Sequence, residues 1–590
     1  MQYDFTSILP RNGRDAIAVD GLGGMPGFTP GAPREGFDAI PMWVADMNFP
    51  TVPTIQKAMA DRIQHPAFGY FSPSEEYFAS IIRWQQKRNG VTGLAKENIG
   101  YENGVLGGVV SALNCVCSRG DKVLLHSPTY VGFTSCLTNN GYDMVLSPLV
   151  KDEEGIWRMD FEDMEKKLKE QKIHAAVLCN PHNPCGRVWE RWELEKAMEL
   201  FKKYDVYVVS DEIWSDLMLN GHKHIPTQSI SEDARQRTAA MYAPSKTFNL
   251  AGLVGSYHII YNKWWKDRVD KESSLCHYNS MNVLSMHALV GAYKPEGYQW
   301  VDQLCEVLSG NINFACDYIR DHFEGVEVSK PQGTYMLFVD CTKWCEAHGK
   351  TIDEVEKACW DVGVAVQDGR MFHGPCHLRM NLALPLSRVQ EAFDRLAKYV
   401  FTDQPAPFPV PAHLAEGDQL PDFVCDTPFE KGVHLADKLK AAPKTALVLL
   451  RYYGCPLCQL DIHELAAHYN EITAAGGQLL VVLQSDPAKL AQQLQPGDLP
   501  FEILCDPDQK LYKALGVWPA PAMVKMGDEA TMDKIRKAAA AGYTHGEFEG
   551  NELQLPAAFV ADSQGRLLWA HYGVSAGDVP GADQLAKLLG

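Results

Sequence analysis

The sequence predicts an α/β fold with a mainly parallel sheet, because short apolar runs alternate with helical stretches up to about residue 400. The runs at 121–128, 174–179 and 206–212 have the length and composition of buried strands. Between the last two, residues 190–205 have a helical period and a lysine-rich end. Strand, helix and strand in this order favour parallel pairing with right-handed crossovers.

Later segments predict a smaller α+β unit. They follow a further apolar run at 255–261 and comprise two apolar runs, at 334–340 and 377–384, and one amphipathic helix at 388–400. We therefore expect a first domain over residues 1–400. Its large α/β/α part is predicted at about 50–290, and its small α+β part should combine the N-terminal segment with about 291–400.

A proline-rich segment at 402–413 separates the first domain from a second one. Its prolines stand at alternate positions, 405, 407, 409 and 411. Proline at this spacing excludes helix and strand interiors and favours an extended spacer. We predict a linker at 401–416 and a second α/β domain at 417–590, with strands at 445–453, 476–486 and 555–562.

Composition excludes several classes of protein. Of the 590 residues, 74 are acidic and 55 basic, a formal charge of −19, so we expect no nucleic-acid partner. No apolar run approaches the roughly 20 residues that span a bilayer, and the N-terminal segment lacks the pattern of a signal peptide. The 16 cysteines fit a reducing compartment. A cytoplasmic enzyme without a membrane partner is expected.

Lys246 is the strongest candidate for a catalytic residue in the first domain. It follows an apolar strand and precedes a loop of small residues, without acidic neighbours in the sequence. Desolvation at such a place lowers the pKa of an amine and prepares it for Schiff-base chemistry. A solvated surface lysine is the ordinary alternative.

Other polar residues end strands or begin helices of the predicted sheet. Asp211 ends the strand at 206–212 and could hold a pyridinium nitrogen protonated, although it could equally cap a helix. Asn183 lies in a turn bracketed by prolines and could donate to a ring hydroxyl. The backbone N–H groups of Gly104, Val105 and Leu106 begin a helix and could bind a phosphate. Tyr130 could stack on a flat ring or pack in the core.

Together these motifs resemble the pyridoxal-phosphate enzymes of the class I/II aminotransferase superfamily. Within it, residues 1–400 are most similar to the MalY/PatB-type C–S β-lyases, often called cystathionine β-lyases. The segments that carry this likeness are PMWVADMNFPTVP, HPAFGYFSP, CNPHNPCGRVW, SDEIWSDL and PSKTFN. The resemblance implies the type I fold of pyridoxal-phosphate-dependent transferases, pyridoxal 5′-phosphate as cofactor and a homodimer.

The resemblance also implies a role for each candidate residue. Lys246 corresponds to the Schiff-base lysine and general base, Asp211 to the partner of the pyridinium nitrogen, and Asn183 to the donor to the ring hydroxyl. Tyr130 corresponds to the catalytic tyrosine that stacks on the ring, and Arg379 to the arginine that binds the substrate α-carboxylate. The phosphate ligands correspond to Ser245 and the backbone of Gly104, Val105 and Leu106, and Tyr70 to a tyrosine that reaches the phosphate of the neighbouring subunit.

Two departures weaken the aminotransferase interpretation. Trp214 stands where many transaminases have a tyrosine, and Val254 where many relatives have a phosphate-binding arginine. The implied reaction is β-elimination from a cysteine-type thioether, giving pyruvate, ammonia and a thiol. An aminotransferase on the same site is one alternative. A cofactor-binding regulatory protein, with the C-terminal domain as an interaction module, is another.

The second domain carries the motif CPLC at the end of a predicted strand. Cys455 at a helix N-terminus should be a nucleophilic thiolate, with Cys458 resolving. A zinc site is the rival, but no second CxxC is present, and we predict no metal. A thiol reductant is the partner that such a dithiol needs.

Residues 417–590 resemble the thioredoxin-like redoxins of the AhpC/TSA group. The resemblance implies that Pro556 is a cis-proline facing the sulfurs. Tyr452 replaces the threonine of typical peroxiredoxins, which favours disulfide exchange over peroxidase activity. We expect Cys425 and Cys505 to be buried apolar residues.

Overall fold

The computed structural model describes residues 2–25, 27–34, 36–276, 278–406, 408 and 413–590. Three linker prolines, at 407, 409 and 411, therefore lie outside the described residues. Contacts group the chain into two compact units. The first contains Met1–Leu9, Pro41–Ala358 and Val366–Pro405, and the second contains Pro10–Ile40, Cys359–Ala365 and Ala406–Gly590. The domain limits derived from the sequence stay a prediction.

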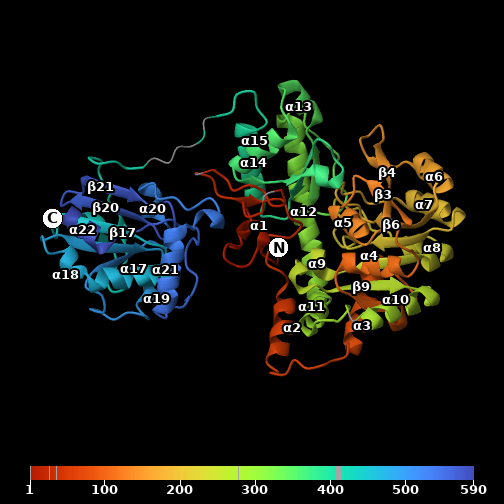
Figure 1. The fold of residues 1–590 in the computed structure, drawn as a ribbon, viewed down its shortest axis with the longest axis horizontal. Coiled ribbons are helices and arrows are strands. Elements are labelled where there is room, and N and C mark those ends of the chain that lie inside the picture. Colours follow the sequence, from red (N-terminus) through yellow and green to blue (C-terminus); the bar gives the residue numbers. More distant parts are fainter. Residues whose placement is uncertain (1, 26, 35, 277, 407, 409–412) are drawn as a thin grey trace. The chain divides into compact units, whose positions relative to one another are not determined.

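An eight-stranded sheet forms the centre of the first unit (Figure 1). Its middle strands are parallel, as predicted, while β9, β2 and β5 pair antiparallel. In spatial order the strands are β2 (Ile99–Glu102), β9 (Ser256–Ile260), β8 (Thr238–Tyr242), β7 (Tyr207–Asp211), β6 (Ile173–Cys179), β3 (Lys122–Ser127), β4 (Asp143–Lys151) and β5 (Trp157–Met159).

Helices cover both faces of this sheet. Successive side chains of a strand point to opposite faces, and here both sets are apolar, so both faces are buried. On β3, Leu124 packs in one apolar cluster, whereas Val123 and Leu125 pack in the other. The helices of this part are α2 (Pro53–Ile63), α3 (Glu75–Asn89), α4 (Val105–Asn114), α5 (Val131–Asn139), α6 (Phe161–Glu170), α7 (Arg191–Lys203), α8 (Glu232–Arg237), α9 (Pro244–Thr247), α10 (Lys263–Cys276) and α11 (Val283–Ala292).

A four-stranded antiparallel sheet forms the small α+β part that the sequence predicts. Its order is β10 (Glu327–Val328), β11 (Met336–Asp340), β14 (His377–Asn381) and β13 (Gln367–Asp368). The long α12 (Pro295–His322) packs against α15 (Leu386–Tyr399). Helices α13 (Thr342–His348) and α14 (Ile352–Asp361) lie between α12 and α15 in the sequence.

The C-terminal domain has a five-stranded mixed sheet typical of the thioredoxin-like fold. The order is β19 (Glu502–Cys505), β18 (Gln478–Leu483), β17 (Lys444–Leu449), β20 (Ala557–Asp562) and β21 (Leu567–Tyr572). Its helices are α16 (Leu435–Leu439), α17 (Pro456–Ala467), α18 (Tyr469–Ile472), α19 (Pro487–Leu490), α20 (Lys510–Ala514), α21 (Glu529–Ala540) and α22 (Ala582–Leu589).

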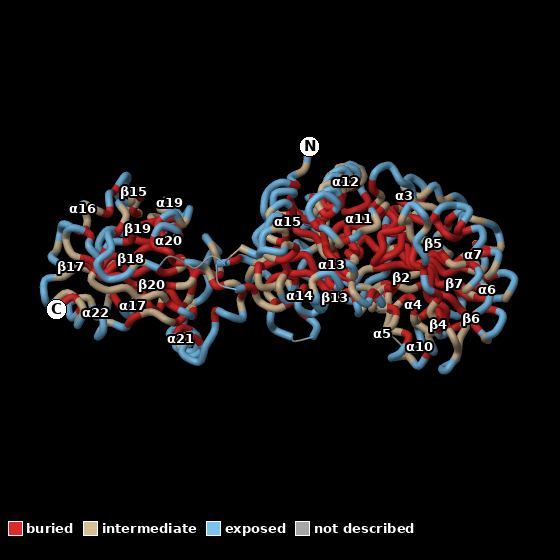
Figure 2. Tube along the Cα trace, turned by 90° about the horizontal axis from the view of Figure 1, so that it is seen from above, coloured by how far each residue is buried: buried red, intermediate tan, exposed pale blue. Residues whose placement is uncertain are grey.

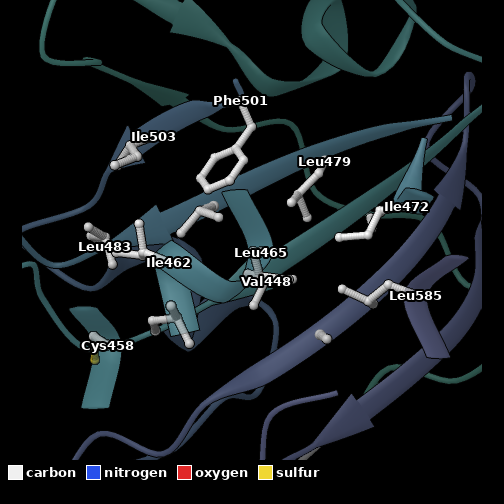
Figure 3. Packing of buried hydrophobic residues seen from close by; sticks show 14 of the residues in the cluster. Val448, Cys458, Ile462, Leu465, Ile472, Leu479, Leu483, Phe501, Ile503 and Leu585 are labelled. Atoms are coloured by element: carbon white, nitrogen blue, oxygen red, sulfur yellow. The ribbon is translucent and has the colours of Figure 1, made fainter. Parts of the chain in front are cut away.

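The core of this domain lies between the sheet and helices on its two faces. Residues of α17 and α22 pack on one face, and residues of α16 and α20 pack on the other. Figure 2 shows the buried residues concentrated along the strands. Figure 3 shows Cys458 at the border of the first cluster, near Ile462 of the same helix. Cys455 belongs to the same cluster, so the apolar core holds both motif cysteines in place.

Among the residues that the structure describes, no helix is both long and apolar enough to cross a membrane.

Candidate functional sites

Lys246 lies in the short helix α9, which begins two residues after β8. Its Nζ donates a hydrogen bond to the carbonyl oxygen of Ala45 at 2.8 Å and lies 5.9 Å from the centre of the Trp214 ring. Burial, reinforced by the positive charge of Arg379, lowers the pKa of this ammonium to about 8. At this pKa about a tenth of Lys246 is free amine at pH 7, and the free amine is the form that attacks a carbonyl carbon.

Asp211 is the last residue of β7 and is buried. Its Oδ1 accepts a hydrogen bond from the Ile213 N–H at 3.0 Å. Burial raises the pKa of this carboxyl group to about 7. A cation placed against Asp211 would therefore restore its ionised form and bind favourably.

The neighbouring Glu212 is held in a hydrogen-bond network instead. Its carboxylate lies 2.7 Å from His224 Nε2 and accepts from the Tyr242 hydroxyl at 2.5 Å and the Thr227 N–H at 3.0 Å. Although burial opposes ionisation, His224 and the hydrogen bonds hold the pKa of Glu212 below its usual value. This network anchors the end of β7 and so fixes the position of Asp211.

Arg379 lies in the middle of β14 and is 3% exposed. Its guanidinium donates to Asn183 Oδ1 at 3.3 Å, to the Trp43 carbonyl at 3.2 Å and to Gln367. Within the described part of the chain its Nε has no hydrogen-bond partner, and no carboxylate pairs with it. Burial lowers the pKa of Arg379 to about 10. A buried guanidinium without a carboxylate is prepared for an anionic ligand.

Asn183 is brought to the same place by the loop that follows β6. The peptide bonds before Pro181 and Pro184 are cis, and Asn183 between them is 3% exposed. Its Oδ1 accepts from Arg379, and its backbone N–H donates to the Cys179 sulfur at 3.4 Å. The predicted partner of the ring hydroxyl and the predicted substrate-binding arginine are therefore in direct contact.

The predicted phosphate-binding segment begins α4. Gly104 is the N-cap with φ 82°, a conformation that glycine adopts without strain, and Val105 and Leu106 form the first turn. Val254 lies beside this turn, since a Cβ on Gly104 would be 3.9 Å from its side chain. Ser245 is half-buried in α9. Val254 carries no charge, so a phosphate bound at this turn would depend on backbone N–H groups and hydroxyls.

The two tyrosines predicted to contact a cofactor have different surroundings. Tyr130 is the N-cap of α5, with its ring 6.4 Å from that of Phe372 and nearly parallel to it. Phe372 in turn lies under the Arg379 guanidinium at 4.1 Å. Tyr70 is fully exposed. Its role across a dimer interface stays a prediction.

Sequence reasoning missed several groups that position the charged side chains. The Ala45 carbonyl accepts from both Lys246 and the Tyr335 hydroxyl, the latter at 3.0 Å. Gln367 and the Trp43 carbonyl orient Arg379. The segment at 41–53 carries part of the family resemblance, but the carbonyl groups of Trp43 and Ala45 do not depend on the type of side chain.

The dithiol motif lies at the N-terminus of α17. Cys455 is the N-cap, and its Sγ accepts from the Cys458 N–H at 3.4 Å and from Arg451 Nη2 at 3.0 Å. The hydrogen bond from the Cys458 thiol and the charge of Arg451 lower the pKa of Cys455 to about 6, although burial opposes them. Burial raises the pKa of Cys458 well above its usual value. Cys455 is therefore the thiolate at neutral pH and Cys458 the thiol.

The expectation that Pro556 follows a cis peptide bond is wrong. The cis bonds among the described residues precede Pro128, Pro181 and Pro184. Pro556 instead leads directly into the extended strand β20, and its carbonyl accepts from the Gly573 N–H at 2.9 Å. This pairing continues the register of β20 with β21 at the end of the sheet that carries the dithiol.

The other cysteines of the C-terminal domain lie apart from the dithiol in the sequence and are buried. Burial raises the pKa of Cys425 to about 11 and that of Cys505 to about 12, which makes both thiols poor nucleophiles. No group of three or more His, Cys, Asp or Glu side chains suited to a metal ion is found among the described residues.

Replacing Arg451 with alanine should raise the pKa of Cys455 from about 6 towards that of an ordinary thiol, because the charge that stabilises the thiolate is lost. The pH dependence of alkylation of Cys455, followed on its peptide by mass spectrometry, measures this shift. Arg536→Ala, at an exposed arginine of the same domain, is the matched control. An unchanged titration in the Arg451 variant would rule out this source of thiolate stability.

Comparison with known proteins places both halves of the chain. Residues 39–396 match the family described as "Aminotransferase class I and II", and residues 464–575 match "AhpC/TSA antioxidant enzyme". The second match begins after Cys458, so it covers most of the C-terminal domain but not the dithiol itself.

Individual relatives agree with the first match. Cystathionine β-lyase PatB of Bacillus subtilis (strain 168) is 32% identical over 389 residues, which are 65% of this chain and 97% of that protein. Protein MalY of Escherichia coli (strain K12) is 28% identical, over 66% of this chain and 96% of its own length. The structure of a PLP-bound C–S lyase from Staphylococcus hominis aligns with a TM-score of 0.60 and 28% identity, covering 67% of this chain and 98% of that one. This chain therefore belongs to the class I and II aminotransferase family, where it is similar to cystathionine β-lyases, and it carries an additional AhpC/TSA-type domain.

Proposed function

We propose that this protein is a pyridoxal-phosphate-dependent C–S β-lyase joined to a thiol–disulfide exchange domain. The first activity converts cysteine-type thioethers to pyruvate, ammonia and a thiol. The observation that carries it is the convergence of Lys246, Asp211 and Arg379, each with its pKa shifted by burial. Similarity to cystathionine β-lyases supports elimination as the outcome.

The residues of this site fit pyridoxal 5′-phosphate group by group. Asp211 offers a buried carboxyl group to a protonated ring nitrogen, and the N-terminus of α4 offers N–H groups to the phosphate. The unpartnered Nε of Arg379 fits the carboxylate of an amino acid bound beside it. When bound, the cofactor supplies an electron-accepting ring next to the substrate α-carbon.

The side chains then divide the work of elimination among them. Arg379 fixes the substrate carboxylate and thereby the orientation of the α-carbon. Lys246 Nζ, released from the Ala45 carbonyl, removes the α-proton, which its lowered pKa permits at neutral pH. Asp211 keeps a proton on the ring nitrogen, and Lys246 can return its proton to the departing sulfur.

The C-terminal domain is proposed to exchange electrons between thiols and disulfides. Its support is the thiolate of Cys455 beside Arg451, with Cys458 held one helical turn away. Exposed Tyr70 and neighbouring apolar Phe68 and Phe71 support a homodimer of the lyase part. Cysteine usage supports a cytoplasmic location, where a thiol reductant is present.

Incubation with cystathionine should release pyruvate, ammonia and a thiol in equal amounts. Lys246→Ala should lower this rate by about 10²–10⁴-fold, because the proton at the α-carbon loses its acceptor. Lys263→Ala, at an exposed lysine, is the control. An oxo acid that retains sulfur, formed with the aminated cofactor, would instead identify an aminotransferase. A Lys246 variant with full activity would disprove the assignment of this site.

Replacing Arg379 with alanine should raise KM for the thioether about 100-fold, because a buried charged partner of the carboxylate is lost. Steady-state kinetics with the substrate and with its carboxamide analogue measure the effect. With the wild type the KM of the carboxamide should exceed that of the substrate, and in the variant the two KM values should be similar. Arg320→Ala, on the exposed surface, should leave both constants unchanged. Equal KM values for the wild type and the Arg379 variant would show that the carboxylate binds elsewhere.

Asp211→Asn should stabilise the cofactor-free protein at pH 8 while weakening cofactor binding. The pKa of Asp211 rises on folding from 3.8 to about 7, so its ionisation costs stability as the pH rises between these values. The cost above pH 7 is at most about 4 kcal/mol. Urea unfolding of both proteins at pH 4 and pH 8 should show a difference at pH 8 and little at pH 4. Equal stability at pH 8 would contradict a buried, uncompensated carboxylate.

A further inference from the structure

Both sulfurs of the CPLC motif are covered. Cys455 is 1% exposed and Cys458 is 4% exposed, although the first is the expected nucleophile. Residues 543–552, between α21 and β20, lie next to this motif without forming helix or strand. We call this segment the strap. Most of its residues are themselves exposed, so it forms an outer layer of the domain.

Four hydrogen bonds tie the strap to the residues around the motif. The Gly546 N–H donates to the Gly454 carbonyl at 2.8 Å, and Gln459 Nε2 donates to the Thr544 carbonyl at 3.2 Å. The Tyr452 hydroxyl lies 3.0 Å from His545 Nε2. Arg451 Nη1 donates to the Glu552 carbonyl at 3.0 Å, while its Nη2 donates to the Cys455 sulfur. One guanidinium therefore bridges the strap and the thiolate.

The fit between strap and motif leaves no room at Gly454. A Cβ at this position would lie 2.5 Å from the Glu547 carbonyl oxygen, which is closer than such atoms approach. On its other side the strap is held by surface contacts, with Glu547 paired to Lys489 at 2.6 Å and Glu549 accepting from the Asp486 N–H at 3.2 Å. Apart from ring contacts such as those of Tyr543 with His463 and of Phe548 with His545 and Arg14, the strap is held by polar contacts, and it therefore belongs to the parts of a fold that open most easily.

We propose that the strap makes Cys455 selective for small disulfides and excludes protein disulfides. This inference rests on the proposed exchange activity and names its substrate class. Attack requires the thiolate to approach one sulfur of the substrate in line with the bond that breaks. A small disulfide needs only a narrow opening, whereas a protein disulfide brings bulky chain on both sides and meets the strap.

The exchange itself balances within this site. The Cys455 thiolate attacks one sulfur of the small disulfide, forming a mixed disulfide and releasing the first thiolate. Cys458 loses its proton and attacks Cys455 Sγ, which releases the second thiolate. The protein is oxidised to the Cys455–Cys458 disulfide, and the substrate takes up two electrons and, from solvent and Cys458, two protons. The thiol reductant then restores the dithiol.

Two reagents of different size test the strap in the full-length protein. Cys455 of the wild type should react with iodoacetamide but far more slowly with a maleimide linked to a polymer of protein-like bulk, each rate relative to a free thiol. Gly454→Ala, which displaces the strap, should raise the rate of Cys455 with the polymer-linked maleimide about tenfold. This factor corresponds to a decrease of about 1.4 kcal/mol in the free energy of opening the strap. Gly527→Ala is the control, since its Cβ meets nothing within 4 Å. Peptide mass spectrometry measures modification at Cys455.

A second variant protects this test against a folding defect. Tyr452→Phe removes only the hydroxyl that contacts His545 and should also accelerate the bulky reagent. Equal relative rates for both reagents in the wild type, or no effect of either variant, would overturn the proposal.

The exchange activity has a separate readout. The wild type should reduce hydroxyethyl disulfide but not insulin, and Gly454→Ala should reduce both. Size-selective labelling without reduction of any disulfide would disprove the exchange activity and leave the cover intact. Reduction of insulin by the wild type would disprove the selectivity.

Discussion

The candidate site of the first unit holds three ionisable side chains out of water without pairing them with one another. Lys246 rests on a backbone carbonyl, Asp211 on a backbone N–H, and Arg379 on amide and carbonyl oxygens. Each of these partners is neutral and compensates only part of the lost hydration. Ligands of complementary charge can therefore bind favourably at this site. The incomplete compensation also explains why the pKa values of Lys246, Asp211 and Arg379 all move towards neutrality.

The fold creates this situation by bringing strand ends together. The parallel strands β6, β7 and β8 have their carboxyl ends on the same side of the sheet. Asp211 is the last residue of β7, and Asn183 and Lys246 lie in the segments that follow β6 and β8. Arg379 arrives from a different sheet, on β14, which pairs with β11 and β13. In the proposed reaction, recognition of the substrate would therefore depend on the small sheet, whereas the proton transfers would depend on the large one. The hydrogen bonds of Glu212 with His224 and Tyr242 hold the end of β7, where Asp211 lies.

Local sequence predicted the strands, the helix at 190–205 and the candidate residues at strand ends, because those signals depend on neighbours in the chain. The groups it missed act over long separations. Ala45 lies 201 residues from Lys246, and its contribution is a carbonyl oxygen that every residue type possesses. The contacts of the strap could not be predicted from the sequence for the same reason. The strap contributes a backbone N–H to Gly454 and a backbone carbonyl to the Gln459 side chain. Pro556 was assigned by family pattern, and its own backbone continues an extended strand instead.

The hydrogen bond between Asn183 and Arg379 has a consequence for altering this enzyme. In the proposed function, Asn183 contacts the cofactor ring and Arg379 the substrate, so a substitution of Arg379 that changes specificity would also remove the hydrogen bond that orients the Asn183 amide. Redesign for substrates without a carboxylate would need compensating substitutions at both positions together, selected as a pair.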